Sequence, residues 1–90
     1  MTITTAAGET TAFDPAETDA APGAPISIMF RNVSSLPHNL TFTGFSAATR
    51  TIVEPGTSDE LVLSPLDAGA FPFVCTIHEG MAGILNVRAT

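Results

Sequence analysis

Short apolar segments with a two-residue repeat, separated by turn residues, run along most of this ninety-residue chain. Ile26, Ile28 and Phe30 alternate with residues that face the other way, which is the pattern of a half-buried strand. Similar segments predict strands at 38–42, 50–54, 60–63, 69–76 and 83–88. No window carries the apolar stripe of a helix, and the best candidate, 45–50, is at most a turn or two. The pattern therefore predicts an all-β sandwich or barrel.

The segment 14–25 departs from this pattern because it is rich in proline and alanine. We interpret it as a surface connection that crosses between sheets, and not as a linker between domains. A chain of this length makes one small domain, so we expect residues 1–90 to form a single domain. Pro72 lies inside a predicted strand, where it removes a backbone donor, so that strand is expected to be free or bulged there.

The charge balance excludes some classes of partner. Nine acidic residues face three arginines and no lysine, which gives a net charge of -6. This charge argues against nucleic acid and against an anionic membrane surface, and it permits the steering of a cationic partner. The alternative is that the acidic residues simply keep a small apolar domain in solution. No apolar stretch reaches the length of about 20 residues that a membrane span needs. The first residues lack the charged start and apolar run of a signal peptide.

The residues with metal-binding chemistry occur in single copies. Cys75 is the only cysteine, which excludes an internal disulfide, and His38 and His78 are the only histidines. Cys75, His78 and Met81 follow one another at the spacing Cys-x2-His-x2-Met. One thiolate, two imidazoles and a weak thioether form the ligand set of a blue-copper electron-transfer site. Cys75 shares its strand phase with Phe71 and Phe73, so it is expected to point inward.

Other interpretations exist for each of these residues. Taken singly, a cysteine on an inner face is a small buried hydrophobe, a histidine is a hydrogen-bonded residue, and a methionine fills the core. Structural zinc prefers four nitrogen, sulfur or carboxylate ligands, and this site offers three, with Glu79 or water as the fourth. A Cys75–His78 pair is also a candidate for nucleophilic catalysis, although a small sandwich leaves little room for a substrate cleft.

At this point the chain resembles the cupredoxin family, the small blue copper proteins that include plastocyanin, pseudoazurin and amicyanin. The resemblance covers most of the length and is carried by Phe13-Asp14-Pro15, Phe30-Arg31-Asn32, Pro37-His38-Asn39, Pro55-Gly56, Leu61-Val62-Leu63 and the stretch 69–83. It implies a Greek-key β-sandwich of about eight strands. The short gap between His78 and Met81 is similar to the amicyanin type of loop.

The resemblance also implies a ligand set and a function. His38, Cys75 and His78 would be the equatorial ligands of one type 1 copper per chain, and Met81 the axial one. The Asn39 N–H would donate to the Cys75 sulfur, while the Asn39 side chain ties the ligand loops together. The expected function is one-electron transfer between redox partners through Cu(I) and Cu(II), without turnover of a substrate, so that the chain is not an enzyme.

Two residues depart from the family pattern. Relatives carry proline two positions after the cysteine, where this chain has Ile77, whose N–H is available for a second hydrogen bond to the sulfur. We hypothesise that this bond raises the reduction potential and that Ile77→Pro lowers it; an unchanged potential would contradict this. Many relatives carry proline directly after the second histidine, where this chain has Glu79. Its carboxylate is expected to favour Cu(II) and to attract a cationic partner.

The expected docking surface surrounds His78, which is expected at the surface with its imidazole edge as the electron route. Leu36, Pro37 and Gly80 would form an apolar collar beside Glu79, and their alternative role is ordinary loop packing. The partners would be redox proteins that bind through small interfaces, and the domain is expected to be a monomer. The resemblance implies an extracytoplasmic location, periplasmic or facing the extracellular space. The alternatives are a copper carrier or storage module, or a cupredoxin domain excised from a larger copper oxidase or reductase.

Overall fold

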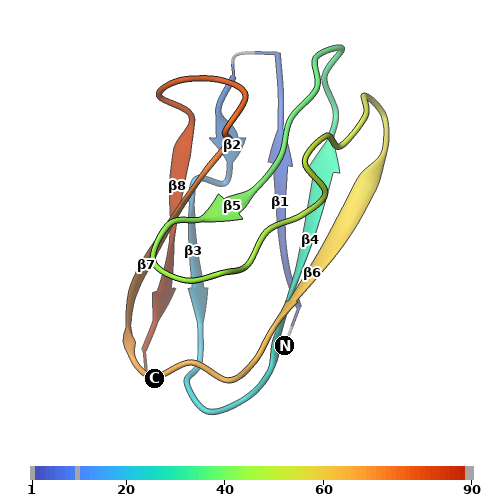
Figure 1. The fold of residues 1–90 in the computed structure, drawn as a ribbon. Coiled ribbons are helices and arrows are strands. Elements are labelled where there is room, and N and C mark those ends of the chain that lie inside the picture. Colours follow the sequence, from blue (N-terminus) through green and yellow to red (C-terminus); the bar gives the residue numbers. More distant parts are fainter. Residues whose placement is uncertain (1, 10, 89–90) are drawn as a thin grey trace.

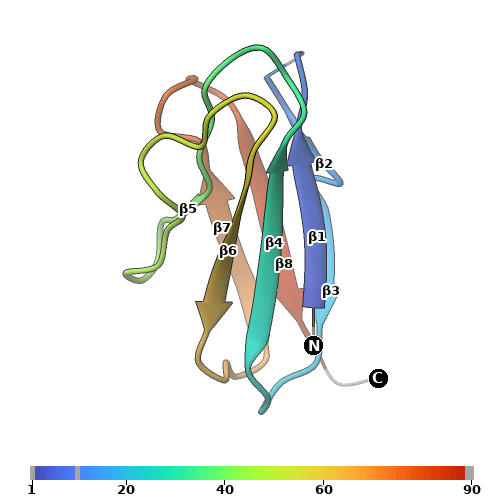
Figure 2. The same cartoon turned by 90° about the vertical axis from the view of Figure 1, so that its right-hand side faces the viewer.

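A computed structural model describes residues 2–9 and 11–88, and within them it contains strands and no helix. Two four-stranded sheets pack face to face (Figure 1), and Figure 2 shows the two layers from the side. One sheet has the order β2-β1-β4-β6, with β1 Thr2–Ala7, β2 Phe13–Asp14, β4 Ile26–Asn32 and β6 Ser58–Leu63. The other has the order β3-β8-β7-β5, with β3 Glu17–Ala20, β5 Thr41–Phe42, β7 Gly69–Val74 and β8 Ala82–Val87. The predicted all-β sandwich of about eight strands is confirmed.

Both sheets are mixed because the chain passes repeatedly from one layer to the other. β1 pairs in parallel with β4, and β3 pairs in parallel with β8, whereas the other neighbours are antiparallel. A parallel pair requires a crossover, and here each crossover runs through the opposite sheet. The consequence is that the loops after β1, β4 and β7 meet at the upper end of the sandwich in Figure 1.

Phenylalanine side chains from the two inner faces fill the core. Phe13 and Phe30 from one sheet lie with their ring centroids 5.8 Å apart, and Phe13 reaches across to Phe73 of the other sheet at 4.9 Å. Phe42 packs edge-on against Phe73 at 5.5 Å. Such pairs contribute about 0.5–1.5 kcal/mol each beyond their area burial. They couple the sheets just below the loops, in a chain that has no Trp or Tyr to do so.

Two expectations about strands are wrong. The segment 14–25 does cross between the sheets, but it includes β3, in which Thr18 and Ala20 are buried against β8. Small residues and a threonine give little apolar signal, so the partner strand decides this element. The predicted strand 50–54 is a loop with a single β-bridge, between His38 and Val53. There the Arg50 N–H donates to the Asp59 carboxylate, so a side chain replaces a ladder bond.

Pro72 lies in β7 opposite Ile84 of β8. Its carbonyl accepts the Thr43 N–H at 3.3 Å on the side of β5, just beyond the end of that strand. The backbone nitrogen and the carbonyl of one strand residue face the same side, so the nitrogen of Pro72 also faces β5. At that point the pairing between β5 and β7 has already ended, and the missing N–H of Pro72 breaks no bond between the strands.

No helix in the described ranges is long and apolar enough to cross a membrane.

Candidate metal centre

The four predicted ligands lie in loops at one end of the sandwich. His38 lies on the segment between β4 and β5, Cys75 follows β7 directly, and Met81 precedes β8. His78 lies in the loop between Cys75 and Met81. Figure 1 shows these segments gathered at the upper end, so residues far apart in the sequence come together there.

His38 is fully buried, with an exposed fraction of 0%. Its backbone forms a bridge with Val53, in which the Val53 N–H donates to the His38 carbonyl at 2.8 Å. Among the residues that the structure describes, neither ring nitrogen has a hydrogen-bond partner. Burial lowers the pKa of His38, and the neighbouring His78 acts in the same direction. The Gly8 backbone and the Glu9 carboxylate act the other way and more weakly, so the Gly8 backbone is near the ring without forming a hydrogen bond of normal geometry.

The loop from Cys75 to Met81 closes on itself. The Cys75 N–H donates to the Met81 carbonyl at 3.0 Å, and the Met81 N–H lies 3.4 Å from the His78 carbonyl. Gly80 has a φ of 82°, a conformation that glycine adopts without strain and that side chains disfavour. Cys75 and Met81 are both buried, as the inward phase of β7 predicts for the cysteine. The closed loop therefore holds both sulfur side chains on the inside of the sandwich.

His78 is half-buried beside His38, and the two ring centroids are 4.8 Å apart. Its Nε2 lies 2.9 Å from the carbonyl oxygen of Pro37, to which a protonated Nε2 donates. This contact leaves Nδ1 as the nitrogen with a free lone pair. The ring is thus anchored by the segment that carries the other histidine.

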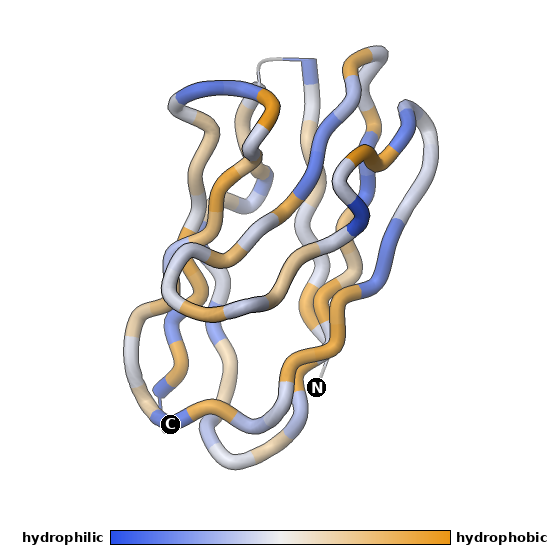
Figure 3. The backbone as a smooth tube through the Cα atoms, viewed as in Figure 1, coloured by the Kyte–Doolittle hydropathy of each residue, from blue (hydrophilic) through white to orange (hydrophobic). Residues whose placement is uncertain are grey.

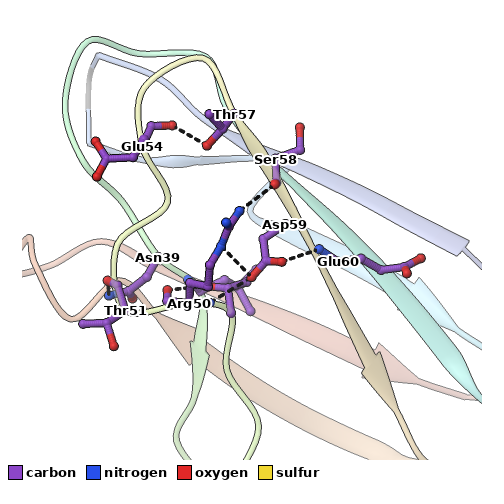
Figure 4. Close-up of polar contacts among 10 residues, drawn as sticks. Asn39, Arg50, Thr51, Glu54, Thr57, Ser58, Asp59 and Glu60 are labelled. Atoms are coloured by element: carbon purple, nitrogen blue, oxygen red, sulfur yellow. Dashed lines mark hydrogen bonds and ion pairs between the residues drawn. The ribbon is translucent and has the colours of Figure 1, made fainter.

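The side chain of Asn39 joins the two ligand segments. Its Nδ2 donates to the Thr76 hydroxyl at 2.7 Å, and its Oδ1 accepts the Thr76 N–H at 3.0 Å. Nδ2 also donates to the Thr51 carbonyl at 2.9 Å. Figure 4 shows this contact next to Arg50, which binds the Ser58 carbonyl and the Asp59 carboxylate. Asn39, which follows His38, and Thr76, which follows Cys75, are therefore held next to each other. The bond to Thr51 connects them to the segment that Arg50 attaches to β6.

Asn32 is a buried residue that sequence reasoning did not identify as part of this site. Its Nδ2 donates to the carbonyls of Leu36 and Val53, and its Oδ1 accepts both the N–H and the hydroxyl of Ser34. These four bonds fix the loop that leads to His38 and the loop that covers it. An asparagine two positions before a pair of serines, at the end of a strand, is the available signal, because such residues form turns with their own backbone.

The remaining predicted residues lie on the same loops. Leu36 and Pro37 are half-buried, whereas Glu79 and Gly80 are exposed. Ile77 is 39% exposed. Val33 and Ile52 are also exposed apolar residues, and Figure 3 shows short hydrophobic stretches within the loops of this end.

In the part of the chain that the structure describes, the histidine and cysteine side chains do not form a compact ligand cluster. Within residues 2–9 and 11–88, no group of three or more His, Cys, Asp or Glu side chains has the arrangement of a metal site. The fourth predicted ligand is a methionine, which such a group does not count, and the Nε2 of His78 is directed at Pro37. The structure thus brings the two rings and the closed sulfur loop to the same end of the sandwich.

Comparisons with known proteins place the chain in a family. The sequence pattern of the cupredoxin-like domain matches residues 1–87. Auracyanin from Roseiflexus castenholzii superimposes with a TM-score of 0.86 at 24% identity, over 98% of this chain and 97% of that one. Auracyanin A, a blue copper protein from Chloroflexus aurantiacus, gives 0.85 at 20% identity, over 98% of both chains. A reduced amicyanin variant gives 0.75 at 22% identity, over 96% of this chain and 81% of that one. No curated protein sequence matches. The chain belongs to the cupredoxin-like domain family, with the fold of auracyanin, amicyanin and plastocyanin.

Proposed function

We propose that this protein transfers single electrons through one copper ion held by His38, Cys75, His78 and Met81. The observation that carries the proposal is the His38 ring, which is fully buried and whose two nitrogens have no hydrogen-bond partner within residues 2–9 and 11–88. A buried polar group without a partner costs about 1–3 kcal/mol, so native structures rarely keep one without a reason. A metal ion that accepts the lone pair of one nitrogen removes that cost for the nitrogen concerned.

The donor chemistry fits copper better than zinc. The proposed set combines donors of different softness: one thiolate, two imidazoles and one thioether. Copper uses this set in electron-transfer sites. His78 offers Nδ1, because the Pro37 carbonyl holds its Nε2. Cys75 and Met81 offer buried sulfurs on one closed loop. When bound, copper supplies a one-electron redox couple between Cu(I) and Cu(II).

Residues around the proposed ligands keep the loop end of the sandwich rigid and form its proposed docking surface. Asn39 and Thr76 hold the segments of His38 and Cys75 together, so little rearrangement accompanies a change of charge. His78 is half-buried, and its ring edge is the proposed route for electrons. Leu36, Pro37, Glu79 and Gly80 form the proposed docking surface around it.

The wider assignment rests on the same family membership. We propose that residues 1–90 form one cupredoxin domain, monomeric, located outside the cytoplasm in the periplasm or facing the extracellular space. Its partners would be redox proteins, with a preference for cationic ones because the net charge is -6. The role is that of a carrier of electrons and not of an enzyme.

Copper loading of the metal-free protein tests the proposal. The expected result is an intense visible thiolate-to-Cu(II) band, an EPR signal of one copper per chain, and reversible voltammetry. Cys75→Ser removes the band, and His38→Gln weakens binding. Glu54→Gln is the control, since it removes a charge from an exposed loop residue that is not a proposed ligand. A colourless product overturns the proposal, and tight Cu(I) binding without a coloured Cu(II) form points to a copper carrier instead.

A further inference from the structure

Glu9 is an exposed carboxylate that joins two loops at the end of the sandwich where the metal centre lies. Its Oε1 accepts the backbone N–H of Ser35, and its Oε2 accepts the Ser35 hydroxyl at 3.0 Å. Two positions earlier, the Ala7 carbonyl accepts the Val33 N–H at 3.0 Å. The chain after β1 is therefore fastened at both points to the segment that leads from β4 to His38.

This fastening holds a negative charge against Ser35, three positions before the buried His38. Gly8 lies between the two fastened residues. Its backbone acts to raise the pKa of His38, and the Glu9 carboxylate acts in the same direction more weakly. Two hydrogen bonds hold its charge in place, whereas an unattached surface carboxylate samples many positions.

We propose that Glu9 is a positioning residue that fastens the loop after β1 onto the segment before His38 and holds one negative charge beside the metal centre. The redox part of this inference rests on the proposed function. A fixed negative charge stabilises the more positive oxidation state of a bound ion, so Glu9 lowers the reduction potential of the centre. The effect weakens with salt, because the carboxylate is exposed.

The fastening is tested in the metal-free protein by amide hydrogen exchange. In Glu9→Ala, the Ser35 and Val33 amides are expected to exchange about tenfold faster, as the loss of a charge-assisted hydrogen bond implies. Glu17→Ala is the matched control. Glu17 is also exposed and also accepts one neutral side-chain donor, Asn86 Nδ2 at 3.0 Å, but it lies in β3. Equal exchange at Ser35 in the wild type and in Glu9→Ala overturns the fastening, whether or not copper binds.

The charge is tested separately in the copper-loaded protein by voltammetry. Glu9→Gln keeps an acceptor oxygen and removes the charge, and Glu17→Gln changes the net charge by the same amount. The reduction potential of Glu9→Gln is expected to be higher than that of the control at low salt, with a difference that shrinks at high salt. Equal potentials in the two variants overturn the redox role.

The outcomes for this inference and for the proposed function are distinguishable. If the wild type forms no coloured copper complex, the proposed function falls and the redox role of Glu9 falls with it. The exchange rates of the metal-free protein then still decide whether Glu9 fastens the two loops.

Discussion

His38 combines two properties that rarely occur together in a folded protein. Its side chain has no exposed surface, and neither of its ring nitrogens has a hydrogen-bond partner in the described part of the chain. Burial penalises the charged imidazolium, and the nearby His78 adds to that penalty, so the pKa of His38 lies below its ordinary value of 6.5. The residue is therefore kept neutral, which is the form that binds a metal ion.

A pH dependence of stability follows for the metal-free protein. Because the folded pKa of His38 is lower than the unfolded one, the unfolded chain binds more protons as the pH falls below about 6.5. The free energy of unfolding is thus expected to decrease as the pH is lowered from about 6.5 to the folded pKa of His38. Below that pKa, protonation of His38 causes no further decrease. Urea denaturation at a series of pH values in the presence of a chelator measures this free energy. His38→Gln should flatten this part of the profile, and an unchanged slope would contradict the assignment.

Asn32 is expected to contribute more to stability than the half-buried Asn86. Asn32→Ala removes four hydrogen bonds and leaves the Leu36 and Val53 carbonyls without this donor, so a loss of roughly 2–4 kcal/mol is expected. Asn86→Ala is the control, because its side chain makes one exposed bond, and it should cost less than about 0.5 kcal/mol. Chemical denaturation of both variants compares them, and equal losses would show that Asn32 does not fix the loops.

At the scale of elements, β7 and β8 carry the closed loop, and their pairing leaves no room at one position. A Cβ atom at Gly83 would lie 2.5 Å from the Phe73 ring and 2.6 Å from the Ala16 carbonyl. The same carbonyl accepts the Ile84 N–H at 2.8 Å, so it cannot move away without breaking this hydrogen bond. Gly83 therefore lets three segments approach closely, two residues beyond Met81.

Gly83→Ala is expected to destabilise the protein by about 1–3 kcal/mol, because the clash involves a backbone oxygen and a buried ring. Thermal unfolding measures the loss. Gly44→Ala serves as control, since a Cβ there meets nothing within 4 Å, and its unfolding temperature should stay near that of the wild type. A Gly83→Ala variant as stable as the Gly44→Ala variant would mean that the strands adjust freely.

At the scale of the whole molecule, the net charge of -6 shapes encounters. Electron exchange with a small cationic complex is expected to slow as salt rises, and exchange with an anionic complex to quicken, because screening acts oppositely on attraction and repulsion. Glu79→Gln should lower the cationic rate more than Glu60→Gln does, because Glu79 lies on the His78 loop and Glu60 on β6. Stopped-flow rates at low and high salt test this, and equal effects of the two variants would remove Glu79 from the docking surface.

Three segments show which strands the sequence pattern predicts and which it does not. The alternation of Phe71, Phe73 and Cys75 correctly predicts a strand and a buried cysteine, because both depend on local phase. β3 was not predicted, because Glu17–Ala20 has almost no apolar signal and is a strand only through β8. The loop at 50–54 was predicted as a strand, because nothing local reveals that the Asp59 carboxylate takes a backbone donor there.

The all-β class, the buried phase of Cys75 and the small set of residue types that could bind a metal are readable from the sequence, since they follow from short-range periodicity and from single-copy residues. Local patterns do not reveal that both nitrogens of His38 are buried without partners among the described residues, that Pro37 anchors His78, or that Asn32 and Glu9 fasten the surrounding loops. Such contacts join residues from different sheets and loops, so their distances depend on how the whole sandwich packs.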